Sequence, residues 1–178
     1  SFDEKKLAEI GNAAADLGVE LLVVDDGWFG HRDGDTSSLG DWYVDKNKLP
    51  NGIEGLYKKL EKSGCKLGIW FEPEMISPES DLYEKHPDWC IHFKNRPRSL
   101  ARTQLMLDLS RKDVCDFVYG SVANVLKTGM VSYIKWDFNR NMTEAGSELL
   151  DSEHAGEFVH RYYLGLYSVL DRLTKDFP

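Results

Sequence analysis

The sequence lacks the marks of several protein classes. Three cysteines, Cys65, Cys90 and Cys115, stand far apart in 178 residues, which excludes a disulfide framework and is typical of a reducing compartment. No CxxC motif and no histidine pair at metal-ligand spacing is present, which argues against a zinc site. No apolar run approaches the roughly 20 residues of a membrane-spanning helix.

Basic residues are also scarce. The chain has 22 Lys and Arg against 30 Asp and Glu, a net charge of −8, and nucleic acid binding needs a basic face. A GxGxxG motif after the first expected strand and a P-loop are both absent, so nucleotide binding has no support. The 42% of hydrophobic residues predicts a globular domain with a substantial core. Five Trp and eight Tyr exceed what such a core requires, and aromatic faces also stack on sugar rings.

Helical and extended patterns alternate along the chain. Apolar spacing predicts helices at 2–17, 53–62, 111–127 and 157–173. Short apolar runs predict buried strands at 21–24, 67–71 and 131–136, and a further short strand at 105–107 within the long loop 77–110. The order predicts an α/β fold with a parallel sheet.

Three strands cannot close a barrel, which needs about eight. We therefore expect residues 1–178 to be a single partial catalytic domain, a fragment of a (β/α)8 TIM barrel truncated at both ends. The strands at 21–24 and 131–136 would be the outer ones, with unpaired edges.

Acidic and aromatic residues follow each strand, at the edge where parallel sheets carry their active sites. The strands lead into DDGW at 25–28, WFEPE at 70–74 and KWDFNR at 135–140. We take Asp137 as the candidate reactive group, and the alternative is an ion pair with Lys135 or Arg140. Asp25 could instead only cap a turn, and Trp70 could only pack in the core.

Two loop features have competing interpretations. Asp33 and Asp35 resemble the start of a calcium loop, but the later ligands are missing, so we interpret them as turn acids. Arg96, Arg98 and Arg102 lie in the long loop. They are either a solvated basic patch or the source of one arginine that reaches a pocket.

The sequence closely resembles the catalytic barrel of glycoside hydrolase family 36, the bacterial α-galactosidases of the melibiase type. The resemblance runs in the family's order through DDGWFG at 25–30, DTSSLGDW at 35–42, LPNG at 49–52, WFEPEM at 70–75, HPDW at 86–89 and KWDFNR at 135–140. It implies a retaining glycosidase with Asp137 as nucleophile and without cofactor or metal. It also implies galactose contacts from six residues: Asp25, Asp26, Trp70, Arg102, Lys135 and Asn139.

These residue types suit the implied chemistry. A retaining glycosidase needs an ionised nucleophile and a second carboxyl about 5–5.5 Å away, and Lys135 or Arg102 would help keep Asp137 charged. Asp25 and Asp26 can accept hydrogen bonds from sugar hydroxyls, and the indole of Trp70 would supply an apolar wall. Spacing alone would offer Glu72 or Glu74 as the acid, but the resemblance places the acid on a later strand and gives these two a structural role.

The resemblance also carries expectations about the whole protein. We expect terminal α-galactose to be cleaved from galactosides such as melibiose and raffinose by a cytoplasmic bacterial enzyme that forms a homo-tetramer. Because the acid lies beyond the matching segments, we expect the 178 residues alone to be inactive. The alternatives are an α-N-acetylgalactosaminidase, a galactosyl transglycosylase, or a non-catalytic sugar-binding module.

Overall fold

A three-stranded parallel sheet forms the centre of the computed structural model, which describes residues 2–178. The strand order is β1 (Leu21–Val24), β2 (Lys66–Phe71) and β5 (Val131–Trp136). The expected parallel pairing and the two outer strands are confirmed. Within this sheet, Val24 lies opposite Ile69, and Phe71 opposite Trp136, so the strands deliver their last residues to one edge.

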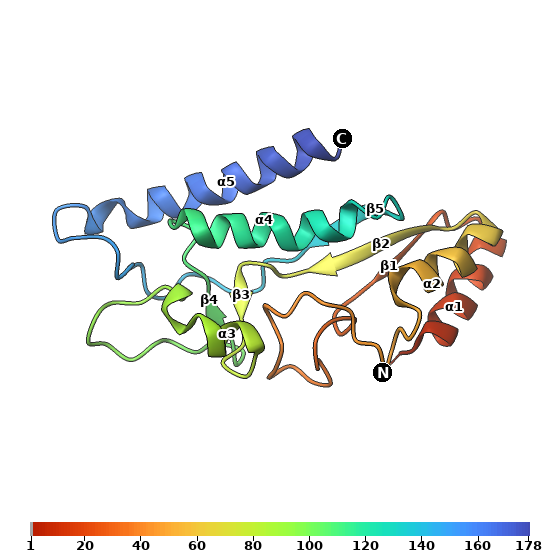
Figure 1. Cartoon of the computed structure of the whole chain (residues 1–178), viewed down its shortest axis with the longest axis horizontal. Helices are drawn as coiled ribbons and strands as arrows, with labels where there is room; N and C mark the ends of the chain where they lie inside the picture. The colour runs from red at the N-terminus through yellow and green to blue at the C-terminus, as the bar shows by residue number, and fades with distance from the viewer. Residues whose placement is uncertain (1) are drawn as a thin grey trace.

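Four long helices connect or flank these strands (Figure 1). They are α1 (Glu4–Asp16), α2 (Gly52–Leu60), α4 (Lys112–Leu126) and α5 (Phe158–Asp176). All four match the predicted helices, with ends shifted by a few residues. The largest differences are at α2, whose last turn is a separate 3₁₀ helix, η1 (Glu61–Ser63), and at α5, which runs on to Asp176.

The long loop before α4 contains structure that the sequence pattern did not predict. β3 (Met75–Ile76) pairs antiparallel with β4 (Leu105–Met106), which is the expected short strand. Between them lie α3 (Asp81–Lys85) and η2 (Pro87–Trp89), and η3 (Ala155–Glu157) precedes α5. Ser80 caps α3, because its Oγ accepts the Tyr83 N–H at 3.0 Å.

An aromatic cluster fills the space beneath the carboxyl ends of β1 and β2. The ring centroids of Phe29 and Trp42 lie 4.5 Å apart, and those of Trp28 and Phe71 lie 5.3 Å apart, edge to face. Trp70 stacks on Phe29 from the pocket side. This packing uses three of the five tryptophans and gives the neighbouring pocket residues a rigid base.

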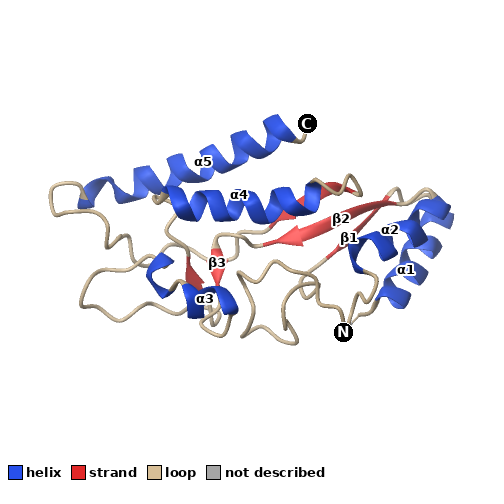
Figure 2. Cartoon of the chain, viewed as in Figure 1, coloured by secondary structure: helices blue, strands red, loops and turns tan. Residues whose placement is uncertain are grey.

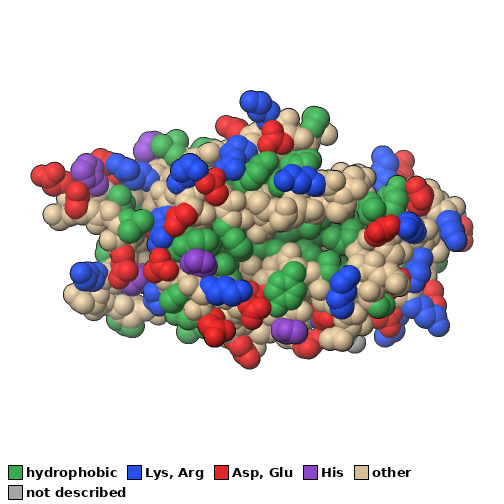
Figure 3. Space-filling view, in the orientation of Figure 1, with side chains coloured by type: hydrophobic (Ala, Val, Ile, Leu, Met, Phe, Trp, Pro, Cys, Tyr) green, Lys and Arg blue, Asp and Glu red, His purple; other side chains and the backbone are tan. Residues whose placement is uncertain are grey.

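The loops gather beyond the carboxyl end of β2, whereas α1 and α2 pair at its other end (Figure 2). On the face shown in Figure 3, hydrophobic side chains form a band across the middle, with charged side chains of both signs around them. The three cysteines are free and buried. Across residues 2–178, the structure contains no helix with the length and apolar character needed to cross a membrane.

Candidate active site

A pocket of about 440 Å³ opens at the carboxyl ends of the three strands. Small-molecule sites typically begin at about 300 Å³, so a single sugar ring is a suitable occupant. Six of the seven predicted site residues line it: Asp25, Asp26, Trp70, Arg102, Asp137 and Asn139. The seventh, Lys135, lies beside it and donates to Asp25. The lining also includes Arg32, Asp35, Thr36, Glu72, Thr103 and Gln104.

Asp137 sits one residue beyond the end of β5. Its N–H donates to the Phe71 carbonyl at 2.8 Å, which continues the pairing with β2 and fixes the backbone. Its Oδ2 accepts the Trp70 Nε1–H at 3.1 Å, and its Oδ1 accepts the Phe138 N–H at 3.1 Å. Asp137 and Trp70 therefore share one side of the sheet and one pocket.

The surroundings of Asp137 favour the ionised carboxylate. Burial raises its pKa, but hydrogen bonding from the Asn139 side chain, Trp70 and the Phe138 N–H, with the nearby charge of Lys135, outweighs burial and holds the pKa below its ordinary value. A carboxylate nucleophile must be ionised to attack. The expected help from Lys135 is present but follows the hydrogen bonds in importance.

The two proposed ion-pair partners of Asp137 bind elsewhere. Lys135 Nζ donates to Asp25 Oδ2 at 2.8 Å, an interaction that raises the pKa of Lys135. Arg140 is buried and donates to the carbonyls of Gln104 at 2.6 Å and Ser99 at 3.2 Å. Asp137 is thus left facing the pocket.

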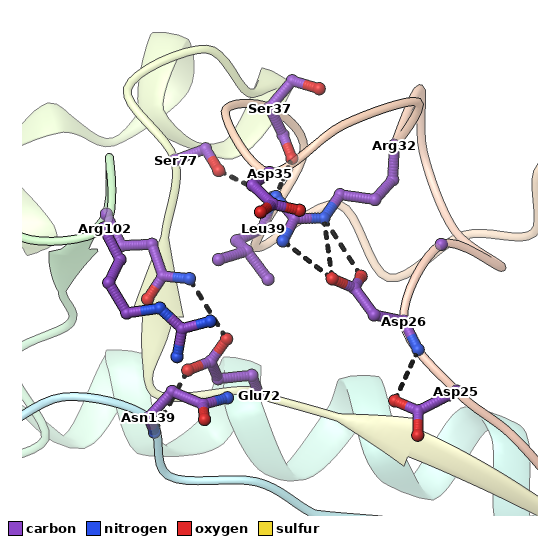
Figure 4. A network of polar contacts seen from close by, with 12 residues as sticks. Asp25, Asp26, Arg32, Asp35, Ser37, Leu39, Glu72, Ser77, Arg102 and Asn139 are labelled. Carbon is purple, nitrogen blue, oxygen red and sulfur yellow. Dashed lines mark hydrogen bonds and ion pairs between the residues drawn. The ribbon is translucent and has the colours of Figure 1, made fainter.

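Asp26 has a partner that the sequence did not reveal. Arg32, buried in the loop after β1, holds the Asp26 carboxylate through Nε at 3.0 Å and Nη2 at 2.9 Å (Figure 4). Asp25 also accepts the Asp26 N–H at 2.9 Å. Asp25 therefore makes a local turn contact as well as lining the pocket, so the two interpretations of this residue are compatible.

Glu72 and Glu74 occupy different layers. Glu72 lines the pocket, accepts the Asn139 N–H at 3.2 Å and the Gln104 Nε2–H at 3.3 Å, and has a pKa raised by burial. Glu74 is fully buried and accepts the Trp136 Nε1–H at 2.8 Å. Both contacts hold the segment that carries the nucleophile candidate, in line with the structural role expected for these acids.

Of the three loop arginines, Arg102 reaches the pocket. Arg98 donates to Tyr83 Oη at 2.9 Å and to the Pro87 carbonyl, and Arg96 lies over the Phe93 ring at 5.2 Å. Arg102 is exposed on the pocket rim, and its backbone adopts a left-handed conformation with φ of 52°.

Two other expectations are refined. Trp70 is only 2% exposed, and its ring lies against the aromatic cluster. Trp70 therefore directs its N–H toward the pocket, and little of its ring is available as the apolar wall that we expected. Of the two acids interpreted as turn acids, Asp33 pairs with Lys48 at 3.2 Å, whereas Asp35 lines the pocket. In residues 2–178 no group of three or more His, Cys, Asp or Glu side chains is arranged to hold a metal ion.

The pocket thus combines the carboxylate of Asp137 with four further acidic side chains, those of Asp25, Asp26, Asp35 and Glu72, and with several N–H donors. An ionised carboxylate can attack an electrophilic carbon, and the flanking groups can bind several hydroxyls of one ligand. Arg32 and Gln104 were missed by sequence reasoning. No motif signals that Arg32 turns back to Asp26 within its own loop, or that Gln104 meets Glu72 from a distant loop.

Known proteins that are similar to this chain include several alpha-galactosidases. The chain is 55% identical over 177 residues to alpha-galactosidase AgaA of Geobacillus stearothermophilus and 45% identical to alpha-galactosidase Mel36A of Lactobacillus acidophilus, covering 99% of this chain and 24% of each relative. A crystal structure of a substituted AgaA in complex with raffinose superposes with a TM-score of 0.97 at 54% identity, covering all of this chain and 25% of that one. The chain thus spans about a quarter of the length of these relatives. The family model for Melibiase matches residues 1–178, and the chain belongs to the Melibiase family.

Proposed function

We propose that the whole protein containing these residues is a retaining α-galactosidase and that Asp137 is its nucleophile. The observation that carries the proposal is the Asp137 carboxylate, which faces the pocket, accepts the Trp70 N–H at 3.1 Å and has a lowered pKa. The alpha-galactosidase names of the relatives, and the raffinose bound to one of them, support the choice of substrate.

The proposed reaction has two displacements. Asp137 attacks the anomeric carbon, the bond from that carbon to the leaving oxygen breaks, and an acid protonates that oxygen. The resulting galactosyl–Asp137 ester is then attacked by water, whose proton returns to the same acid. We propose that this acid lies outside residues 1–178, because Glu72 and Glu74 are both engaged in holding backbone and side-chain groups.

Specificity for galactose would come from the carboxylates on the β1 side of the pocket. Asp25 and Asp26 can accept hydrogen bonds from adjacent hydroxyls, and Asn139 and Arg102 line the opposite side. A site that bonds an axial hydroxyl rejects the epimer that lacks it, because its buried polar groups lose their partner. Lys135 would act mainly by holding Asp25.

We also propose that the sheet is three neighbouring strands of a (β/α)8 barrel within one catalytic domain. Two features support this. β1 and β5 are each paired on one side only within the described sheet. An apolar groove lined by Leu126, Ile134 and Leu170 runs between β5 and the ends of α4 and α5, as expected beside a missing strand.

Chemical rescue of Asp137→Gly in the whole protein tests the nucleophile. We expect a rate loss of at least 10⁴-fold on galactosides, of the size seen on removing a covalent nucleophile. Added azide should restore turnover of an activated galactoside and give a galactosyl azide of inverted configuration, because azide replaces the missing carboxylate. Asp16→Ala, an exposed acid on α1, should leave the rate unchanged. A variant that retains activity without azide would refute the assignment.

The isolated 178 residues provide a second test. We expect no turnover of melibiose or raffinose, because protonation of a sugar leaving group needs the missing acid. A nitrophenyl galactoside needs little acid assistance and could still galactosylate Asp137 slowly, which mass spectrometry would detect. Turnover of raffinose at the rate of the whole protein would contradict the proposed location of the acid.

A further inference from the structure

Arg32 is a buried residue whose guanidinium contacts a carboxylate of the pocket. Its side chain is 4% exposed, and that of Asp26 is 35% exposed. Nε lies 3.0 Å from Oδ1 and 3.3 Å from Oδ2 of Asp26, and Nη2 lies 2.9 Å from Oδ2. Figure 4 shows the guanidinium pointing directly at the carboxylate. Both carboxylate oxygens of Asp26 therefore accept hydrogen bonds from Arg32.

Arg32 is itself held in place by the loop. Its Nη1 donates to the Ser37 carbonyl at 2.8 Å, and its N–H donates to the Phe29 carbonyl at 3.3 Å. Its own carbonyl accepts the Lys48 ammonium at 2.5 Å. The Ser37 contact orients the guanidinium, and the other two hold the Arg32 backbone. A planar donor held in this way fixes the plane of the carboxylate that it binds.

Asp25 offers an internal comparison. Its side chain is 61% exposed and is paired with Lys135, whose side chain is 42% exposed. An ammonium is a point charge and does not set the plane of a carboxylate as a guanidinium fork does, and the other contact of Asp25 is the Asp26 N–H on Oδ1. Each carboxylate oxygen can accept about two hydrogen bonds. Oδ2 of Asp26 already accepts two from Arg32, whereas Oδ1 accepts one and keeps one acceptor direction for the pocket.

We propose that Arg32 is a positioning residue that sets hydroxyl specificity by fixing the plane of the Asp26 carboxylate. The proposal rests on the proposed galactosidase function. Arg32 acts through Asp26: it orients the acceptor directions on which a sugar hydroxyl must align. A lysine at position 32 keeps the charge but loses the fork, so the hydroxyl bonded by Asp26 is recognised less sharply.

The test asks whether Arg32→Lys changes how much each sugar hydroxyl contributes to kcat/KM of the whole protein. The penalty for a hydroxyl is the factor by which kcat/KM falls when its deoxy analogue replaces the full galactoside. The substrates are nitrophenyl α-galactoside and its four monodeoxy analogues. Asp26→Asn first identifies the hydroxyl that Asp26 binds: it is the hydroxyl whose removal penalty falls most in this variant relative to the wild type. In Arg32→Lys, kcat/KM on the full galactoside should fall on the order of 100-fold, as for a misplaced binding group. The penalty for removing that one hydroxyl should shrink at least several-fold, while the penalties at the other hydroxyls stay as in the wild type.

Two comparisons separate positioning from folding. Each penalty is a ratio of two kcat/KM values measured on one protein sample, so a loss of folded enzyme lowers both values equally and cancels. Arg111 makes a similar fork to Asp113 at 3.1 and 2.8 Å but does not line the pocket. Arg111→Lys should leave every penalty unchanged. In the Asp26→Asn background, Arg32→Lys should have little further effect.

The outcomes are distinguishable. If Arg32→Lys lowers kcat/KM equally on all five substrates, Arg32 only stabilises the loop and the inference is overturned. Unchanged kinetics in Arg32→Lys would overturn it as well. If the wild-type protein hydrolyses none of the galactosides, the proposed function fails and this inference fails with it.

Discussion

The buried carboxyl of Glu74 should make the stability of the protein depend on pH. Glu74 is fully buried, and its Oε1 has no hydrogen-bond partner among residues 2–178. Burial, followed by the charges of Glu72 and Asp137, raises its pKa from 4.5 to about 8. Glu74 is therefore protonated at neutral pH in the folded protein, so it adds no negative charge close to Asp137.

The sign of the effect follows from the two pKa values. Between pH 4.5 and about 8 the unfolded chain has lost the Glu74 proton and the folded protein has kept it. Unfolding then releases a proton, so the free energy of unfolding falls as the pH rises through this window. Each pH unit corresponds to about 1.4 kcal/mol. Over the window of about 3.5 units the loss is on the order of 5 kcal/mol.

Glu74→Gln removes this titration because an amide resembles the protonated acid. We expect the free energy of unfolding of the variant, relative to wild type, to increase between pH 5 and pH 8 and then to level off. Urea unfolding of the whole protein at several pH values measures the difference. Glu9→Gln, on the exposed face of α1, serves as the control and should give a curve parallel to wild type. A parallel curve for Glu74→Gln itself would show that Glu74 is charged in the folded state and would refute the reasoning.

Further predictions concern helix packing and the Asp137 carboxylate. Gly165→Ala should destabilise the protein by several kcal/mol, because its Cβ would lie 1.8 Å from the Leu109 carbonyl oxygen. Gly120→Ala has open space and should stabilise α4 by up to about 1 kcal/mol; equal urea midpoints for the two variants would contradict the packing. Trp70→Phe should lower kcat/KM roughly 10- to 100-fold, because it removes a hydrogen bond to a charged group, and should move the acidic limb of the pH profile upward as the pKa of Asp137 rises. An unmoved limb would show that the Trp70 N–H does not set that pKa.

The sequence predicted the regular part of the fold and most of the pocket. The apolar run of β1 and the mainly apolar start of β5 made these strands recognisable, and the polar residues directly after the strands pointed to Asp25, Asp26 and Asp137. β3 and α3 were missed because they are too short to have a period. Tertiary contacts hold them instead: the Asp41 carboxylate accepts the N–H groups of Asp81 at 3.1 Å and Leu82 at 3.0 Å.

The two missed site residues, Arg32 and Gln104, also depend on tertiary contacts. Arg32 sits in a loop of turn residues, and nothing in its neighbourhood indicates that its side chain turns back to Asp26. Gln104 meets Glu72 from a different loop, through a hydrogen bond of 3.3 Å. The first contact depends on the path of one loop and the second on how the strands place two loops, so neither is visible in the local sequence pattern.

The reactivity of the three buried thiols can report local unfolding of the protein. Burial raises the pKa of Cys90 to about 12 and that of Cys115 to about 11, and a protonated, covered thiol does not react with alkylating reagents. Cys65 precedes β2, Cys90 lies in the loop segment between β3 and β4, and Cys115 lies in α4. The order in which iodoacetamide labels them under mild denaturant would therefore report which layer of the unmodified protein loosens first.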